Sequence, residues 1–150
     1  MDKLNFSIVI NSSVENVWNK MLGDKTYRIW TEAFAPGSHY KGDWSEGSKI
    51  LFLAPNNEGI MGGMVSRIKE NRKHKFISIE HLGIVKDGNE DSSSDEVKAW
   101  AGAHENYTFV KKDNNTTEVI VEMDSNEEYA EMFKGMWPKA LNILKELSEK

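Results

Sequence analysis

Cysteine is absent from the 150 residues of the chain. The protein therefore has no disulfide bond, no thiolate metal site and no cysteine nucleophile, which agrees with a reducing compartment. Long apolar runs are absent too, and the N-terminus, MDKLNFSIVI, carries an acid at position 2 and only a short apolar stretch. Such a segment predicts neither a signal peptide nor a membrane span, so we expect a cytoplasmic protein.

Basic charge is in the minority. The chain has 19 lysines and arginines against 24 aspartates and glutamates, a net charge of −5, and its densest basic stretch is NRKHK at residues 71–75. Binding to nucleic acid needs a larger basic surface than this. We therefore expect no nucleic-acid partner.

Common cofactor and nucleophile motifs are missing as well. No GxGxxG, P-loop or GxSxG pattern occurs, and the histidines match no metal-ligand spacing such as HExxH. We expect neither a cofactor nor a metal.

With 39% hydrophobic and 10% aromatic residues, the chain has the composition of one globular domain covering residues 1–150.

Apolar residues near the end of the chain follow the period of an α-helix. They recur through residues 126–149 at helical spacing, and Ser125 with Glu128 predicts a capping box at the start. Gly135 and Pro138 fall on the polar side, where they predict a bend around the core. The predicted inward residues are Tyr129, Met132, Phe133, Met136, Trp137, Ala140, Ile143, Leu144 and Leu147.

The start of the chain predicts one strand and two short helices. Residues 3–10 alternate apolar and polar side chains, as a half-buried strand does. A helix is predicted over residues 14–22, with a capping box from Ser12 and Glu15. A second helix, capped by Asp24, is predicted over residues 24–34.

Residues 38–124 carry strand and turn signals almost throughout. Because the connections are short, the strands are predicted to be antiparallel. Residues 86–103 are too polar at their start for a strand and predict a long surface loop, in which Ser93 and Glu96 cap one helical turn before Trp100. The predicted strands cover residues 38–44, 48–54, 60–70, 75–85, 105–111 and 116–123.

This order of elements predicts an α+β protein. A curved antiparallel sheet of about six or seven strands is expected to wrap around the C-terminal helix, because that helix carries the broadest apolar face. A helix across a strongly curved sheet contacts its rims better than its floor, so we expect an internal hollow, which is a common place for a ligand.

Three stretches of the chain carry a resemblance to a known superfamily. SSVENVWNKMLGDKTYRIW, KGDWSEGSKILF and GMWPKALNILKEL resemble, in this order, the first helices, the glycine turn and strand, and the terminal helix of START-like (SRPBCC superfamily) domains. Within the superfamily, the chain is most similar to the activator of heat-shock protein 90 ATPase homologue-like family. The resemblance implies a helix-grip fold with a cavity, but no single activity, since the superfamily includes lipid and hormone binders, polyketide cyclases and co-chaperone domains.

Polar residues on two predicted strands form the first candidate site. If His81 pairs opposite Tyr107, strict alternation places His81, Glu105 and Tyr107 on one inner face. There they would orient a ligand's carbonyl or hydroxyl group, and a histidine beside a carboxylate can also act as an acid or base. The alternative is that Glu105 lies in water at the strand end while His81 only satisfies a hydrogen bond in the core.

Apolar residues complete the candidate binding site. Trp30, Phe109 and Trp137 lie on predicted inward faces. Hydrophobic core is the favoured interpretation for most of the inward tryptophans and methionines, but Met132 and Met136 are adaptable side chains that could equally line a permissive cavity. An aromatic residue in a polar loop needs something to pack against, so Trp100 is predicted to act as a lid over the cavity mouth.

Three functions remain open at this point. The first is binding of a small hydrophobic molecule without catalysis. The second is a polyketide cyclase-like enzyme that uses His81 or Glu105 to move a proton. The third is an interaction module for a chaperone partner, heat-shock protein 90, and a homodimer is compatible with each.

Overall fold

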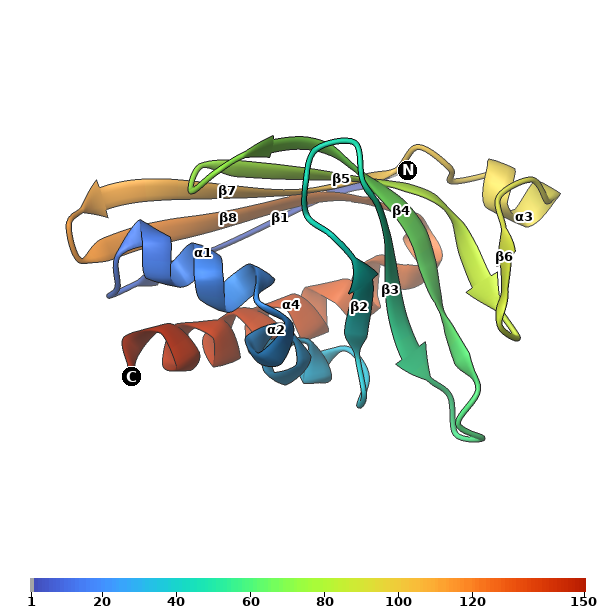
Figure 1. The fold of residues 1–150 in the computed structure, drawn as a ribbon, viewed down its shortest axis with the longest axis horizontal. Helices are drawn as coiled ribbons and strands as arrows, with labels where there is room; N and C mark the ends of the chain where they lie inside the picture. Colours follow the sequence, from blue (N-terminus) through green and yellow to red (C-terminus); the bar gives the residue numbers. More distant parts are fainter. Residues whose placement is uncertain (1) are drawn as a thin grey trace.

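The computed structural model describes residues 2–150. One strand and two short helices come first, strands dominate the middle, and a long helix ends the chain (Figure 1). The elements are β1 (Asp2–Ile10), α1 (Val14–Leu22), α2 (Asp24–Trp30), the 3-10 turn η1 (Thr31–Ala33), β2 (His39–Gly42), β3 (Lys49–Pro55), β4 (Met61–Arg72), β5 (Phe76–Lys86), β6 (Asn89–Asp91), α3 (Asp95–Lys98), β7 (His104–Asp113), β8 (Thr116–Ser125) and α4 (Glu127–Glu149).

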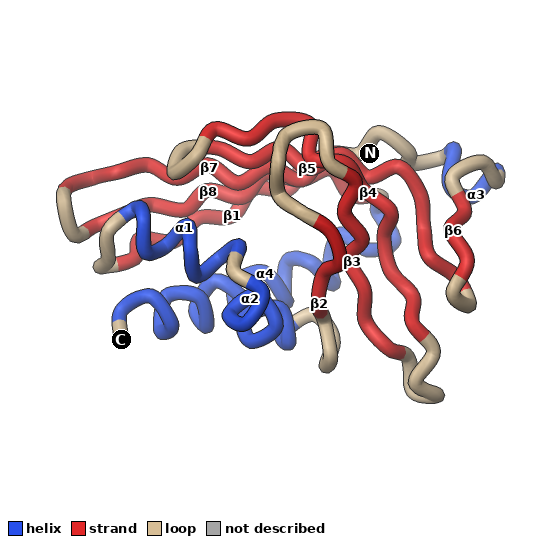
Figure 2. The backbone as a smooth tube through the Cα atoms, in the orientation of Figure 1, coloured by secondary structure: helices blue, strands red, loops and turns tan. Residues whose placement is uncertain are grey.

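A single antiparallel sheet forms the main layer. Its strand order is β1-β8-β7-β5-β4-β3-β2, and the short β6 pairs with β5 outside this path. The sheet curves over α4, and α1 and α2 lie on the same side of it as α4 (Figures 1 and 2). The predicted α+β class and helix-grip architecture are therefore confirmed.

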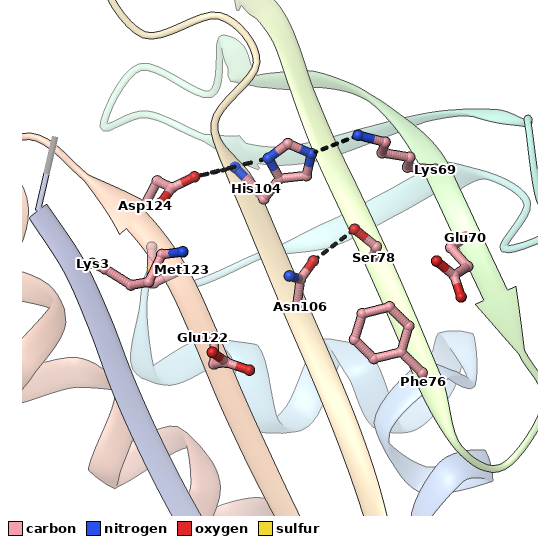
Figure 3. A pocket seen from close by; sticks show the side chains of 10 residues that line it. All are labelled: Lys3, Lys69, Glu70, Phe76, Ser78, His104, Asn106, Glu122, Met123 and Asp124. Atoms are coloured by element: carbon pink, nitrogen blue, oxygen red, sulfur yellow. Dashed lines mark hydrogen bonds and ion pairs between the residues drawn. The ribbon is translucent and has the colours of Figure 1, made fainter.

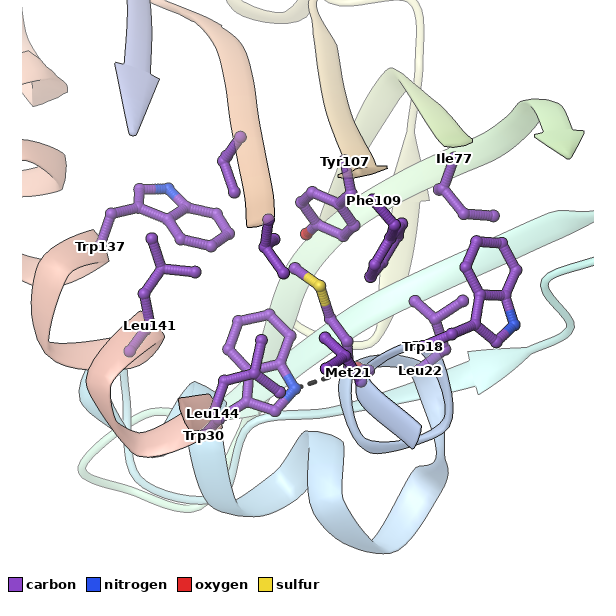
Figure 4. Close-up of a cluster of buried hydrophobic side chains, with 14 of the residues drawn as sticks. Trp18, Met21, Leu22, Trp30, Ile77, Tyr107, Phe109, Trp137, Leu141 and Leu144 are labelled. Atoms are coloured by element: carbon purple, nitrogen blue, oxygen red, sulfur yellow. Dashed lines mark hydrogen bonds between the residues drawn. The ribbon is translucent and has the colours of Figure 1, made fainter. Parts of the chain in front are cut away.

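The core lies between the inner face of the sheet and the helices. Alternation along the strands directs Ile77, Ile79, Val119 and Val121 into it, and all four are buried. Trp30 and Trp137 meet in the same cluster (Figure 4). The helices α1 and α4 contribute further buried side chains to this cluster, among them Val17, Trp18, Met21, Ala140, Leu141 and Leu144.

The packed face of α4 is narrower than its apolar pattern. Tyr129 and Met132, both predicted to face inward, are 47% and 42% exposed. The buried face is centred on Ala130, Trp137 and Leu141, and at 100° per residue Met132 points well away from that line. Gly135 and Pro138 are exposed, as their polar side predicted, while the bend they imply stays a prediction.

The helix N-caps differ from the prediction by one residue. The N-cap side chains of α1, α3 and α4 are Ser13, Ser94 and Asn126, each accepting a hydrogen bond from the backbone N–H three residues later. In each case a second good capping residue follows the predicted one, and local sequence cannot choose between the two. The second helix begins at Asp24 with Gly23 as its cap residue. The predicted caps Ser12, Ser93, Ser125 and Asp24 are therefore wrong.

The stretch predicted as a long loop is partly structured. β5 continues to Lys86, and a tight turn with positive φ at Asp87 and Gly88 leads into β6. A three-residue strand of polar side chains has no apolar alternation, so it left no signal in the sequence. Within residues 2–150, no helix is long and apolar enough to cross a membrane.

Candidate functional site

The pairing of β5 with β7 places the candidate polar residues. Ile77 lies opposite Tyr107 and Ile79 opposite Glu105, so the predicted pairing of His81 with Tyr107 is wrong by four residues. The backbone N–H of His81 instead donates to the carbonyl of Ala103, at 2.9 Å, at the end of the loop that precedes β7. Side chains alternate between the two faces of a sheet, so a shift of four residues leaves each side chain on the same face. His81, Glu105 and Tyr107 therefore still share the inner face, as predicted.

Four side chains form a continuous hydrogen-bonded chain on this face. His81 Nε2 lies 3.2 Å from Glu105 Oε1, and the Tyr107 hydroxyl donates to Glu105 Oε2. On the other side of the imidazole, Ser66 Oγ lies 2.7 Å from Nδ1. The side chains of His81 and Glu105 are 11% and 18% exposed, so the carboxylate keeps limited contact with solvent.

Ser66 is a member of the site that the sequence did not reveal. It pairs opposite His81 next to a β-bulge between Val65 and Ser66. A single serine in a strand is not distinctive, and the bulge that sets its register has no reliable sequence signal. Only the assembled sheet identifies Ser66 as the partner of the imidazole.

The hydrogen-bond partners of His81 determine which ring nitrogen carries the hydrogen when the imidazole is neutral. An ionised carboxylate can only accept, so the contact with Glu105 requires a hydrogen on Nε2. Nδ1 is then an acceptor, and the Ser66 hydroxyl donates to it. If His81 gains a proton, the same hydroxyl can turn and accept from Nδ1, so Ser66 accommodates both charge states.

Two phenols near Glu105 remain protonated. Burial raises the pKa of Tyr107 well above its ordinary value of 10.0, and the charge of Glu105 raises it further. Burial and the same carboxylate also raise the pKa of Tyr27. Both tyrosines are therefore neutral hydrogen-bond donors at neutral pH, and both lie within the field of Glu105.

Aromatic rings surround this polar chain. Tyr27 packs against Trp30, Tyr40, Trp44 and Phe52, with ring centroids between 5.0 and 6.3 Å apart. Phe52 in turn lies 6.3 Å from the His81 ring, and Trp137 lies 6.0 Å from Tyr107. The carboxylate of Glu105 is thus set in a mostly apolar, aromatic part of the inner face.

Three of the predicted binding residues are part of the close-packed core. Trp30 and Trp137 are 1% and 2% exposed, and their Nε1 groups donate to the Met21 carbonyl and to Met123 Sδ. Phe109 is buried against Trp18, further along β7 than the polar chain (Figure 4). Their predicted contact with a ligand stays a prediction.

The other predicted site residues lie at the margin of the fold. Met136 is half-buried, whereas Met132 faces solvent and does not line the interior in this structure. Trp100 lies two residues after the end of α3 and is half-buried. Its role as a lid stays a prediction.

Two hollows on the described part of the chain lie away from the helix-covered face. The first, of about 330 Å³, lies on the outer face of the sheet, where His104 is placed between Lys69 and Asp124 (Figure 3). The second, of about 290 Å³, is lined by residues of β4 and β5 near β6. The hollow expected between the sheet and α4 is neither of these and stays a prediction.

Comparisons with known proteins give matches among solved structures. No protein-family profile matches the chain, and no curated protein matches it. The Aha1 dimer from Colwellia psychrerythraea is 18% identical, with a TM-score of 0.68 over 99% of this chain and 97% of that chain. Protein NE0264 from Nitrosomonas europaea is 15% identical, with a TM-score of 0.72 over 98% of this chain and 96% of that chain.

A third similar structure comes from a different functional setting. The di-domain ARO/CYC protein StfQ, from the steffimycin biosynthetic pathway, is 13% identical with a TM-score of 0.65, over 97% of this chain and 44% of StfQ. Identities this low show a common fold alone. The structural neighbours are thus Aha1-like and ARO/CYC proteins, and the fold implied by the sequence resemblance is confirmed.

Proposed function

We propose that this chain binds a small apolar molecule on the inner face of its sheet, with Glu105 as the polar contact. The observation that supports this proposal is the hydrogen-bonded chain of Ser66, His81, Glu105 and Tyr107 within aromatic surroundings. A carboxylate offers about four lone-pair positions, and the protein uses two of them. A donor group on a ligand can use the others, since Glu105 is not fully buried.

The ligand would occupy space between the sheet and α4 after small side-chain shifts. Phe52, Phe133 and Met136 are half-buried, so they can move with less loss of packing than the buried core residues. Methionine adapts well to a changed neighbour because its side chain is unbranched. Binding would therefore displace these half-buried side chains and widen the space between the sheet and α4.

A carboxylate substitution tests the proposal. Glu105→Gln keeps an acceptor for the Tyr107 hydroxyl and removes the charge. Because hydrogen bonds to charged groups are stronger than neutral ones, we expect an apolar alcohol or amine to bind at least about tenfold more weakly to the variant. Binding is measured by tryptophan fluorescence and by the shift of the melting temperature.

Glu122 provides the matched control. It lies on β8 next to Asn106 of β7 and lines the outer hollow, so Glu122→Gln removes an equal charge on the opposite face. This variant should bind like the unmodified protein. If gently purified protein retains no small molecule in native mass spectrometry, and no apolar compound raises its melting temperature, the binding proposal is wrong.

The His81–Glu105 pair supports a second candidate, an enzyme of the polyketide cyclase type. A histidine held between a serine and a carboxylate can take up and release a proton near neutral pH. His81→Ala should then abolish turnover of a bound substrate while ligand binding, followed by fluorescence, is retained. Loss of binding and turnover together would instead assign His81 to binding.

Assembly with other chains is a further proposal. The Colwellia Aha1 neighbour is a dimer, and this chain exposes Tyr129 and Met132 on α4. Sedimentation equilibrium will show whether the chain forms a homodimer.

A chaperone partner is tested by adding the chain to heat-shock protein 90 and measuring the ATPase rate of the chaperone. An unchanged rate with no detectable complex would remove this role.

A further inference from the structure

We infer that the molecule bound at Glu105 carries a protonated amine attached to an apolar, aromatic body. This inference rests on the proposed binding function and names the chemical class of its ligand. Three properties of the site lead to it: the charge partners of Glu105, the field that its carboxylate creates, and the rings around it.

Glu105 is a carboxylate without a permanently charged partner. In the described part of the chain its ion-pair partner is His81, which is charged only if protonated. Its other hydrogen-bond partner, Tyr107, is neutral. By contrast, Glu80 pairs with an arginine and Glu118 with a lysine. A partly buried carboxylate is more favourable when it is paired, so a cationic group at this site would supply the permanent charge that its partners in the protein lack.

The negative charge acts on its neighbours. Burial raises the pKa of both Tyr27 and Tyr107, and the charge of Glu105 raises each further, although Glu105 is hydrogen-bonded to Tyr107 and not to Tyr27. Partial burial strengthens such fields because little water screens them. A ligand cation entering this region would be attracted, and a ligand carboxylate would be repelled.

The rings around Glu105 also favour a cation over a neutral donor. Phe52 lies beside His81, and Trp137 lies beside Tyr107, so an aromatic ring neighbours each of the two residues that hydrogen-bond to the carboxylate. Such rings attract an ammonium group within about 6 Å of their centres. A hydroxyl group can hydrogen-bond to Glu105 but gains neither the ion pair nor the cation–π contact. The net charge of −5 adds a weak long-range attraction for cations.

A matched series of probes tests the charge preference. We would measure calorimetric affinities of 1-naphthylmethylamine, 1-naphthalenemethanol and 1-naphthoic acid at neutral pH, since these share one apolar body. We expect the amine to bind about tenfold more tightly than the alcohol, because its ammonium group adds an ion pair and a cation–π contact to the hydrogen bond that both probes can make, and the acid to bind most weakly. Glu105→Gln should abolish the preference for the amine, and the Glu122→Gln control should retain it.

The outcomes separate this inference from the proposed function. If the alcohol binds as well as the amine, or if Glu105→Gln retains the preference, the ligand class is wrong while binding on the inner face stands. If none of the three probes binds and none raises the melting temperature, both proposals fail. The comparison of the three probes on the unmodified protein decides the question even if Glu105→Gln folds poorly, and circular dichroism reports that folding.

Discussion

At the scale of single residues, Ser66 is the side chain on which the candidate site depends. It is fully buried, and its hydroxyl is the partner of His81 Nδ1. Without it, a buried ring nitrogen would lack a hydrogen bond, and the imidazole would lose one of the two contacts that fix its orientation. The serine thus positions a histidine that itself positions the Glu105 carboxylate.

Ser66→Ala tests this dependence. We expect the free energy of unfolding, measured by urea denaturation, to fall by about 1–3 kcal/mol, because a buried acceptor is left unsatisfied. Ser7→Ala on β1 serves as the control, since Ser7 is exposed and its loss should change stability by no more than about 0.5 kcal/mol. Equal values for the two variants would show that the Ser66 hydroxyl contributes nothing through His81.

At the scale of secondary-structure elements, two glycines differ in whether the fold needs the absence of a side chain. Gly135 lies within α4, where an added Cβ would meet no atom within 4 Å. Gly63 lies in β4 with φ of 151°, and an added Cβ would overlap the Phe52 carbonyl oxygen of β3. The first glycine only loosens its helix, whereas the second permits close approach of two strands.

These positions give a paired prediction. Gly135→Ala should raise the free energy of unfolding by about 0.5–1 kcal/mol, because alanine restricts the unfolded chain and favours the helix. Gly63→Ala should lower it by more than about 1 kcal/mol, because the strand must shift away from Phe52. Chemical denaturation of both variants measures the two effects. A destabilised Gly135→Ala protein would contradict the exposed placement of this residue.

At the scale of the whole molecule, two buried phenols set the stability at high pH. Burial and the charge of Glu105 raise the pKa of Tyr27 and Tyr107 above 10.0 in the folded protein. The unfolded chain therefore loses these protons at a lower pH than the folded one. Stability from this source is complete below about pH 10 and is lost as the pH rises above it.

Alkaline titration checks this expectation. We expect the free energy of unfolding to fall above about pH 10, by up to about 1.4 kcal/mol per pH unit for each of the two tyrosines. Tyr27→Phe and Tyr107→Phe should each reduce that slope, and ultraviolet absorbance should show two phenols ionising together with unfolding. A slope that neither substitution changes would contradict the assignment to these residues.

The sequence by itself determined most of the architecture. Strand positions, the two short helices and the long α4 followed from side-chain period, and the single apolar face of α4 indicated what covers the sheet. These properties are readable because they depend on neighbours one to four residues away. The shared inner face of His81 and Glu105 was readable for the same reason, since alternation survives any even shift of register.

Only the tertiary structure decided how the elements meet. The loop before β7 pairs with His81 and sets the register, and a β-bulge brings Ser66 to the imidazole. The rotation of α4 about its axis leaves Met132 in solvent, and the spacing of the helices brings Trp30 and Trp137 together. Contacts of this kind join residues far apart in the chain, and packing of the whole molecule, rather than any local period, determines them.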